Sequence, residues 1–383
     1  DVSGNDDLPY YATRSYFASS DYMGLASGLT IAGIGNEKIQ WERTRRINIG
    51  VDANLLNNRL GVRFNYFRSA TDHLLMWQEM SYLSGLDKTW GNGGKLENRG
   101  FDVEATGVVW ASPSWQWQVG ASVGHYKNKV TALPDGQRYM DTEILGATVR
   151  TEIGRPANLF YGYKAQGVFS TSAEAQAAGL YIHDDNGVDR TAFEAGDMHF
   201  ADLDGDHFIT EADRMVIGDP NPDIYGNIFT SVQYRRLRLD VRFNYSLGND
   251  IYNYTRQQLE SGSRFMNQTT ALARRWQMEG QQTDIPRLSF QDPMGNSRFS
   301  DRWIEDGSYL RLKTVTLSYD LPVSSTFLQG LQFWVQANNV VTLTRYLGSD
   351  PEGTALSAVL GQGIDAGSLP QSRNFMVGIK INL

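Results

Sequence analysis

Oxygen-bearing side chains recur at regular intervals in the segment DLDGDHFITEAD, which runs from Asp202 to Asp213. A 12-residue calcium loop takes its ligands from positions 1, 3, 5, 7, 9 and 12, and position 7 supplies a backbone carbonyl. In this chain the six positions are Asp202, Asp204, Asp206, Phe208, Thr210 and Asp213. Because calcium prefers six to eight oxygen ligands, this spacing predicts that one short turn surrounds the ion.

Two positions of this loop depart from the usual pattern. Position 6, where glycine permits a sharp turn, is His207, while Gly205 lies one residue after Asp204. Position 12 is Asp213 instead of glutamate, which shortens the reach for a contact through both oxygens. The loop also lacks two flanking amphipathic helices, since TSAEAQAAG is only a short helical candidate upstream and DPNPD interrupts the chain downstream. We expect a structural calcium site, with magnesium or an ion-free acidic turn as the alternatives.

The sequence carries no recognisable catalytic motif. None of its five histidines forms a metalloprotease pair, and there is no cysteine. The Gly-x-Ser-x-Gly run at residues 120–124 lies within an alternating strand segment, so it is not a nucleophile elbow. The neighbouring carboxylates Glu305 and Asp306 are typical of solvated loop charge. We therefore predict a protein that is not an enzyme.

Charge and hydrophobicity exclude two further classes. The net charge of −8 argues against a general nucleic-acid-binding protein, which would present a basic face. No run of 18 apolar residues exists, so a membrane-spanning helix is excluded. Aromatic residues make up 12% of the chain, and aromatic side chains are favoured in strands.

Apolar and polar residues alternate with a period of two along much of the chain. The stretch RINIGVDA places Ile47, Ile49, Val51 and Ala53 on one face and polar residues on the other. The same alternation recurs in GFDVEATG, RLDVRFNYS and the terminal RNFMVGIKINL, where the apolar face ends at Leu383. We count roughly ten to twelve such strands by the alternation template.

The predicted connections between these strands are short and long in turn. Short ones fall at 54–59, 111–114, about 235–237 and about 321–330, and long ones at about 130–155, 171–223, 249–303 and 345–370. An outer-membrane barrel has short periplasmic turns and long extracellular loops, whereas a soluble sandwich has turns of similar length at both ends. The pattern favours an all-β, antiparallel transmembrane β-barrel with its apolar face toward lipid. The alternative is a soluble or surface-attached β-sandwich that binds carbohydrate and is stabilised by calcium.

Several segments resemble one family when they are taken together and in order. They are GIGNEKIQWERTRRINIGVDANLLNNRLGVRFNYF, GGKLENRGFDVEATG, DLDGDHFITEADRMVIGDPNPDIYGNIFTSVQY, YLRLKTVTLSYDLP and FWVQANNVVTLTRYLGSDPE. This set is similar to the barrel of SusC/RagA-type TonB-dependent transporters, and the resemblance covers nearly the whole chain. The apolar end at Leu383 also resembles the C-terminal assembly signal of outer-membrane barrels, with Leu in place of the usual aromatic residue.

The resemblance implies a 22-stranded barrel in a bacterial outer membrane, with an N-terminal plug domain inside it. It also implies a TonB-contacting segment, a surface lipoprotein partner of the SusD type, and import of oligosaccharides or oligopeptides. Residues 1–383 show neither a plug nor a TonB-contacting segment, and ten to twelve strands cannot close such a barrel. We therefore expect the C-terminal part of the transporter barrel, with a small closed barrel of ten or twelve strands as the alternative.

Two expectations concern the predicted extracellular loops. The metal would order a loop of roughly 50 residues near the lipoprotein, without a catalytic role. The stretch TTALARRWQMEGQQTD, residues 269–284, is the strongest helical candidate in the chain. We expect a loop helix there, or alternatively a segment that meets the lipoprotein.

Overall fold

The structure is a computed structural model of the 383-residue chain. It describes residues 2–3, 11–22, 26–81, 83, 85–86, 88–183, 187, 189–322, 329–354 and 361–382. Leu383, which the sequence placed at the end of the last apolar face, lies outside the described residues. Among the described residues, no helix is both long enough and apolar enough to cross a membrane.

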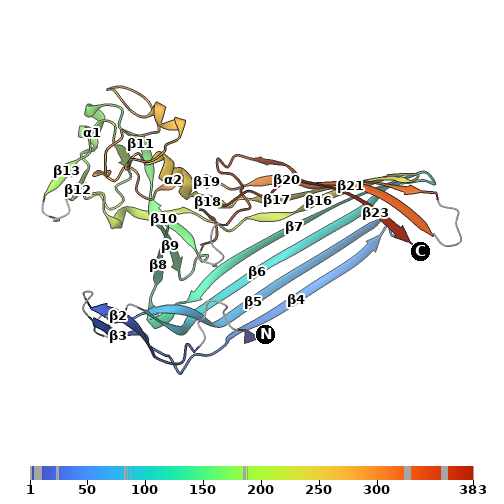
Figure 1. The fold of residues 1–383 in the computed structure, drawn as a ribbon, viewed down its shortest axis with the longest axis horizontal. Coiled ribbons are helices and arrows are strands. Elements are labelled where there is room, and N and C mark those ends of the chain that lie inside the picture. Colours follow the sequence, from blue (N-terminus) through green and yellow to red (C-terminus); the bar gives the residue numbers. More distant parts are fainter. Residues whose placement is uncertain are drawn as a thin grey trace.

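One large antiparallel sheet dominates the fold (Figure 1). In spatial order its ten strands are β1 (Val2–Ser3), β4 (Glu42–Leu55), β5 (Leu60–Glu79), β6 (Lys88–Ala111), β7 (Trp115–Ala132), β16 (Ile224–Tyr234), β17 (Leu237–Leu247), β20 (Tyr309–Leu321), β21 (Gly330–Thr344) and β23 (Asn374–Asn382). From β4 onward, each strand pairs with the next main-sheet strand along the chain. The antiparallel fold and the strand segments predicted from the alternation are confirmed.

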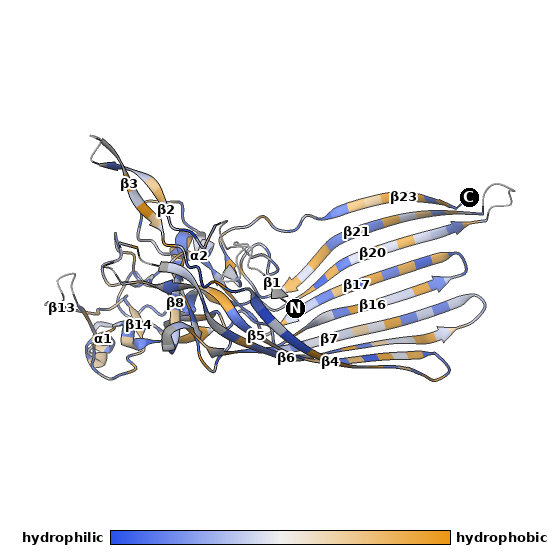
Figure 2. Cartoon of the chain, turned by 90° about the horizontal axis from the view of Figure 1, so that it is seen from below, coloured by the Kyte–Doolittle hydropathy of each residue, from blue (hydrophilic) through white to orange (hydrophobic). Residues whose placement is uncertain are grey.

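Strand pairing joins the apolar faces of the strands into one continuous surface, and Figure 2 shows the alternation along each strand. Val51 pairs with Phe64 on β5, and Val335 of β21 pairs with Val377 of β23. The exposed apolar side chains of this outer face include Ile47, Ile49, Val51, Phe64, Tyr66, Ile228, Leu239, Leu317, Tyr319, Phe333, Val335, Phe375, Val377, Ile379 and Ile381. A β-sandwich would cover such a face with a second sheet, whereas these side chains are open to the surroundings. The sandwich alternative is therefore wrong, and the face suits contact with lipid.

Tight turns join the strands at one end of the sheet. The turn between β4 and β5 has Leu56, Asn57 and Asn58 in the left-handed region, with φ values of 53°, 53° and 63°. Asparagine tolerates this backbone conformation better than most residues, so the Asn pair fits the turn predicted there. The turn between β16 and β17 contains Arg235 with a φ of 54°.

Aromatic side chains gather near these tight turns. Trp110, Trp115, Trp117 and Tyr234 are all exposed, and the rings of Trp115 and Tyr234 lie 4.5 Å apart. Barrels carry such aromatic girdles at the membrane interfaces, where one part of the ring is apolar and another is polar.

The long connections gather at the opposite end of the sheet (Figure 1). The sequence predicted separate connections at 130–155 and 171–223, but the structure has one connection from 133 to 223. It contains β8 (Tyr139–Ile144), β9 (Ala147–Glu152), β10 (Leu159–Tyr163), β11 (Ala165–Val168), α1 (Ser172–Ala178), β12 (Tyr181–His183), β13 (Arg190–Ala192), β14 (Met198–Phe200) and β15 (Arg214–Gly218). The prediction failed because the strands between the two predicted connections pair within the connection and not with the main sheet. β10 pairs with β9 and β15, and β11 pairs with β14.

The other two long connections also hold short elements. Residues 248–308 contain β18 (Asp250–Asn253), α2 (Tyr254–Glu260) and β19 (Ile304–Asp306), and residues 345–373 contain β22 (Ile364–Asp365). The helix predicted at 269–284 is wrong, because only a 3-10 turn forms there, at Thr270–Arg274. The backbone N–H of Trp276 instead bonds Ile285 O, and its indole N–H bonds Ser170 O at 3.1 Å. These tertiary contacts override the local helix propensity.

In the part of the chain that the structure describes, two hydrophobic cores are built mainly from residues of the connections. The first contains Tyr163, Phe169, Ala175, Leu180, Phe193, Met198, Phe200, Ile209 and Met294. The second contains Ala147, Val149, Phe160, Tyr252, Phe299, Trp303 and Ile364. The connections thus fold into a cap with its own apolar interior. A separate hairpin of β2 (Tyr16–Tyr22) and β3 (Ala26–Gly33) lies at the same end of the sheet (Figure 1).

A pair of neighbouring substitutions on β20 tests the assignment of faces. Leu317→Arg places a charge on the outer face and should lower the free energy of unfolding by up to about 2–4 kcal/mol if the residue lies near the membrane midplane. Thr316→Arg places the charge on the inner face and should change that free energy little. The measurement is the fraction of the protein in membrane extracts that migrates as a folded band before boiling. Equal loss of that band in both variants would contradict the assignment.

Candidate functional site

The acidic loop lies between β14 and β15, on the surface of the first core. Phe208 forms a bridge with Tyr181 of β12, whose backbone N–H bonds His207 O at 2.9 Å. Ile209 follows and is buried among the apolar side chains of that core. These contacts attach the loop to a rigid support.

Three of the six predicted ligand residues come together in the structure. One oxygen from each of Asp202, Asp204 and Asp206 lies within 4.8 Å of the others. Their carboxylates also accept backbone N–H groups, with Gly205 N 2.7 Å and His207 N 3.0 Å from Asp202, and Phe208 N 2.7 Å from Asp206. The carboxylates are thereby held on the inside of one turn, the arrangement that a cation with oxygen ligands requires.

His207 adopts the backbone conformation for which glycine is usually needed. Its φ is 67°, and that of Gly205 is 78°. The departure from the glycine pattern noted in the sequence therefore does not prevent the sharp turn. It places backbone strain at His207, because left-handed conformations are unfavourable for a residue with a Cβ atom.

The remaining predicted residues have structural partners of their own. Asp213 is fully buried, and its two oxygens accept the backbone N–H groups of Leu203 at 2.7 Å and Thr210 at 2.8 Å. The Thr210 hydroxyl accepts Ala212 N at 3.2 Å. Asp213 and Thr210 thus close the loop through hydrogen bonds, and Asp213 is not among the three clustered carboxylates. The role predicted for the Phe208 carbonyl stays a prediction.

Repulsion between the carboxylates is visible at Asp204. A hydrogen bond from the backbone N–H of Asp206 lowers the pKa of Asp204, but partial desolvation and the nearby charges of Asp206, Asp213 and Asp202 outweigh it and raise the pKa above its ordinary value. A divalent cation would relieve this repulsion. The three clustered carboxylates therefore fit a divalent cation that prefers oxygen ligands, such as calcium.

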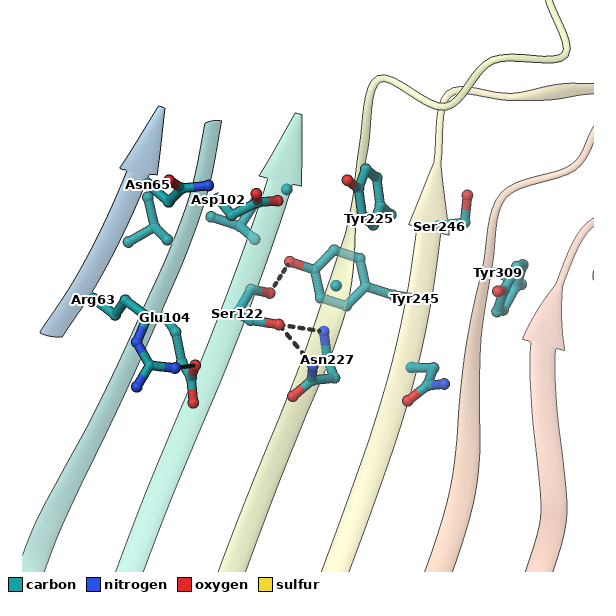
Figure 3. Close-up of a pocket in the computed structure, with 15 residues that line it drawn as sticks. Arg63, Asn65, Asp102, Glu104, Ser122, Tyr225, Asn227, Tyr245, Ser246 and Tyr309 are labelled. Atoms are coloured by element: carbon teal, nitrogen blue, oxygen red, sulfur yellow. Dashed lines mark hydrogen bonds and ion pairs between the residues drawn. The ribbon is translucent and has the colours of Figure 1, made fainter. Parts of the chain in front are cut away.

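A second candidate site lies on the polar inner face of the sheet, where polar residues of successive strands form rows (Figure 3). The strand register puts one row in the order Asn65, Asp102, Gly124, Tyr225, Ser246 and Tyr309. The neighbouring row is Asp52, Arg63, Glu104, Ser122, Asn227, Asn244 and Arg311. A groove of about 490 Å³ follows these two rows across six strands, from β5 to β20, and we call it the inner-wall groove.

Gly124 shapes this groove by having no side chain. A Cβ atom at this position would lie 2.7 Å from Cζ of Tyr225, so only glycine leaves room for that ring beside β7. In the next row the Ser122 hydroxyl accepts a hydrogen bond from the side-chain amide of Asn227 at 2.7 Å (Figure 3). The groove is thus lined by ordered neutral polar groups.

The charged groups of the inner-wall groove are only partly paired. Arg63 bonds Asp52 at 3.0 Å and Glu104 at 3.3 Å. Among the described residues, Asp102 has neither a hydrogen-bonding partner nor an ion-pair partner in the structure. One carboxylate therefore remains available to a solute in the groove.

At the mouth of the groove a buried ion network fastens the 345–373 connection to β20. Arg311, whose side chain is 3% exposed, pairs with Asp350 and, at 2.6 Å, with Glu352. Lys313 lies at a β-bulge in β20, and its ammonium is 3.2 Å from Glu352. Burial raises the pKa of Asp350, but hydrogen bonds from Arg311, Gln371 N and Glu352 N outweigh it, so this pKa lies below its ordinary value.

The sequence analysis did not identify the inner-wall groove or the ion network. The alternation assigned residues such as Asp102 and Glu104 to the polar face, but it did not show which polar residues of different strands are neighbours. The sequence feature that could have indicated the ion network is YLRLK, in which Tyr309, Arg311 and Lys313 alternate with apolar residues. Its partners in the 345–373 connection depend on tertiary structure.

A sheet that is apolar outside, polar inside and extended by long connections at one end is the wall of an outer-membrane β-barrel. The family model described as "TonB dependent receptor-like, beta-barrel" matches residues 5–144. TonB-dependent receptor P3 of Formosa agariphila is 30% identical over 99% of this chain and 38% of the relative. TonB-dependent receptor SusC of Bacteroides thetaiotaomicron is 24% identical over 98% of this chain and 35% of the relative.

Solved structures agree with these relatives. The structure of the RagAB peptide transporter matches with a TM-score of 0.77 and 25% identity, covering 99% of this chain and 40% of that one. The RagAB peptide importer in the "open-open" state gives a TM-score of 0.75. The chain is thus similar over nearly its whole length to TonB-dependent receptors, whose barrels lie in the bacterial outer membrane.

The predicted resemblance to SusC/RagA-type TonB-dependent proteins is confirmed. The chain spans about two fifths of the length of the curated relatives named first, or 38% for receptor P3.

Removing Arg311 tests whether the ion network holds the 345–373 connection. Arg311→Met leaves the Asp350 and Glu352 carboxylates buried without their main partner, which should cost about 3–5 kcal/mol locally. Arg238→Met is the control, because Arg238 and Asp240 form an exposed pair worth at most about 1 kcal/mol. Amide hydrogen exchange in residues 345–354 should accelerate only in Arg311→Met, and equal exchange in both variants would show that the network does not hold the connection.

Proposed function

We propose that this chain forms part of the barrel through which a TonB-dependent receptor imports oligosaccharides or oligopeptides. The observation that carries the proposal is the inner-wall groove. It is a polar groove of about 490 Å³ on the face of the sheet opposite to the apolar outer face. Such a wall lets a hydrated solute pass while the outer face remains in lipid. The inner face offers hydrogen bonds to such a solute, and we propose transport of the cargo without bond chemistry.

The names of similar proteins also support a role in import. The similar solved structures are described as a peptide importer, and SusC is among the similar receptors. We propose that the complete receptor takes its energy from TonB through a part outside this chain. We also propose that a SusD-like surface lipoprotein covers the capped end of the barrel, where the three long connections gather.

Uptake by the complete receptor tests this function. Cells that lack the receptor should lose uptake of the labelled oligosaccharides or oligopeptides that wild-type cells import, and a protonophore should abolish the wild-type uptake. A SusD-like lipoprotein should co-purify with the receptor in mild detergent. Unchanged uptake after deletion of the receptor would refute the proposal.

Two substitutions on β16 connect that uptake to the groove. Asn227→Trp fills the inner-wall groove and should reduce uptake several-fold, because the indole occupies the path of the solute. Ile228→Trp places the same side chain on the lipid face, where aromatic residues are tolerated, and should leave uptake unchanged. Both variants should show the heat-dependent gel shift of a folded barrel.

We also propose that the acidic loop binds calcium and that the ion is structural. The clustering of Asp202, Asp204 and Asp206 and the raised pKa of Asp204 support this assignment. The ion would fix a turn that belongs to the cap and contributes Ile209 to its first core.

Protease protection measures this binding. Calcium should slow cleavage within residues 195–220, since a ligand at 100 times its Kd stabilises the bound form by about 2.7 kcal/mol. A chelator or the double substitution Asp204→Asn, Asp206→Asn should remove the protection, and magnesium is tested in a parallel sample. Glu211→Gln is the matched control, because this exposed neighbour pairs with Arg214 and lies outside the cluster. An identical cleavage pattern with and without chelator would contradict calcium binding.

A further inference from the structure

A second cavity lies where the three long connections leave the inner face of the sheet. Its volume is about 490 Å³, and we call it the mouth cavity. Pro220 comes from the 133–223 connection, Asn249 from 248–308, and Gln362 from 345–373. Tyr309 and Lys313 of β20 also line it. The mouth cavity is thus assembled by all three connections.

The mouth cavity adjoins the inner-wall groove. Ser246 and Tyr309 line both spaces. These residues pair with each other across β17 and β20, so they form a shared border at the end of one polar row. A chain-like solute can therefore occupy the mouth cavity and extend into the groove.

Two charged side chains line the mouth cavity, Lys313 and Glu352, and both belong to one ion network. Glu352 accepts hydrogen bonds from Arg311 at 2.6 Å, Lys313 at 3.2 Å and the Tyr309 hydroxyl at 2.9 Å. Asp350 pairs with Arg311, so two cationic and two anionic side chains form one closed set. No net charge from this set is left for a ligand.

The other polar side chains in the lining are neutral. They are Ser246, Asn249, Thr354, Gln362 and Gln371. Amide and hydroxyl groups both donate and accept hydrogen bonds, and they match the hydroxyl groups of a sugar. A charged ligand would lose hydration without gaining a counter-charge here, which is costly.

We propose that the mouth cavity is a cargo subsite that takes a segment of a neutral oligosaccharide. The proposal rests on the proposed import function and narrows its cargo. An oligopeptide brings charges at its termini and on ionisable side chains, whereas a neutral oligosaccharide brings only hydroxyl, ether and amide groups. The balanced ion set and the neutral lining favour the oligosaccharide.

The first experiment measures ligand selectivity on the complete receptor in detergent. The probes are neutral hexamers of α-glucan, β-glucan, xylan, mannan and N-acetylglucosamine, the cationic deacetylated form of the last, an oligouronate, and a mixture of hexapeptides. At least one neutral hexamer should bind, and its affinity should exceed those of the charged oligosaccharides by about ten-fold or more, which corresponds to 1.4 kcal/mol. Binding of hexapeptides without any neutral hexamer would overturn this inference and leave the import proposal standing.

The second experiment places that binding in the mouth cavity. Ser246→Trp and, separately, Thr354→Trp fill the cavity from β17 and from the 345–373 connection, and each should weaken binding of the neutral hexamer about ten-fold. Thr316→Trp is the control, because it puts the same side chain on the inner face of β20 away from the lining. Folding is checked by the heat-dependent gel shift, and unchanged affinity in both folded cavity variants would overturn the assignment.

A charge substitution tests the reason for the selectivity. Lys313→Met leaves the ion set with one excess negative charge and should improve binding of the cationic glucosamine hexamer relative to its neutral N-acetylated form. An unchanged ratio would show that charge balance does not determine selectivity. The import function itself is tested separately, by comparing uptake in wild-type cells and in the deletion strain. Equal uptake in those two strains would contradict the import function and not the selectivity of the mouth cavity.

Discussion

The structure depends on one constraint, that the backbone N–H and C=O groups of its long strands must be paired within the sheet. Hydrocarbon offers no water to replace a missing hydrogen bond, so each strand must lie in register with its neighbours. A slip by one residue would turn every apolar side chain of a strand toward the lumen. Register shifts in the large sheet are therefore local, as at the bulge that carries Lys313 on β20.

This pairing also determines where chemistry is possible. Because the outer face is largely apolar, the ion pairs of Arg63 and Arg311 lie on the inner face of the sheet and at its capped end. The register brings together residues such as Asp102 and Tyr225, which are distant in sequence, and Gly124 provides the space between them. The same strands support a buried ion network at the mouth, where Arg311 meets the 345–373 connection.

The sequence was sufficient to predict the strands, their two faces and the contrast between short and long connections, because alternation is a local property of each strand. It also located the acidic loop, whose carboxylates at Asp202, Asp204 and Asp206 do come together. It did not predict the inner-wall groove, since neighbours within a row depend on pairing between distant strands. The helix expected at 269–284 failed for a related reason, because the contacts of Trp276 with Ser170 and Ile285 outweigh local propensity.

The cap has a consequence for how the protein can be assembled. Its first core combines residues of the 133–223 connection with Met294, and its second adds Tyr252 and Phe299 from 248–308 and Ile364 from 345–373. Neither core can be completed by a single connection. During biogenesis these segments must reach the cell exterior before their apolar side chains find their final partners, so the second core of the cap can close only after the last of the three has been exported.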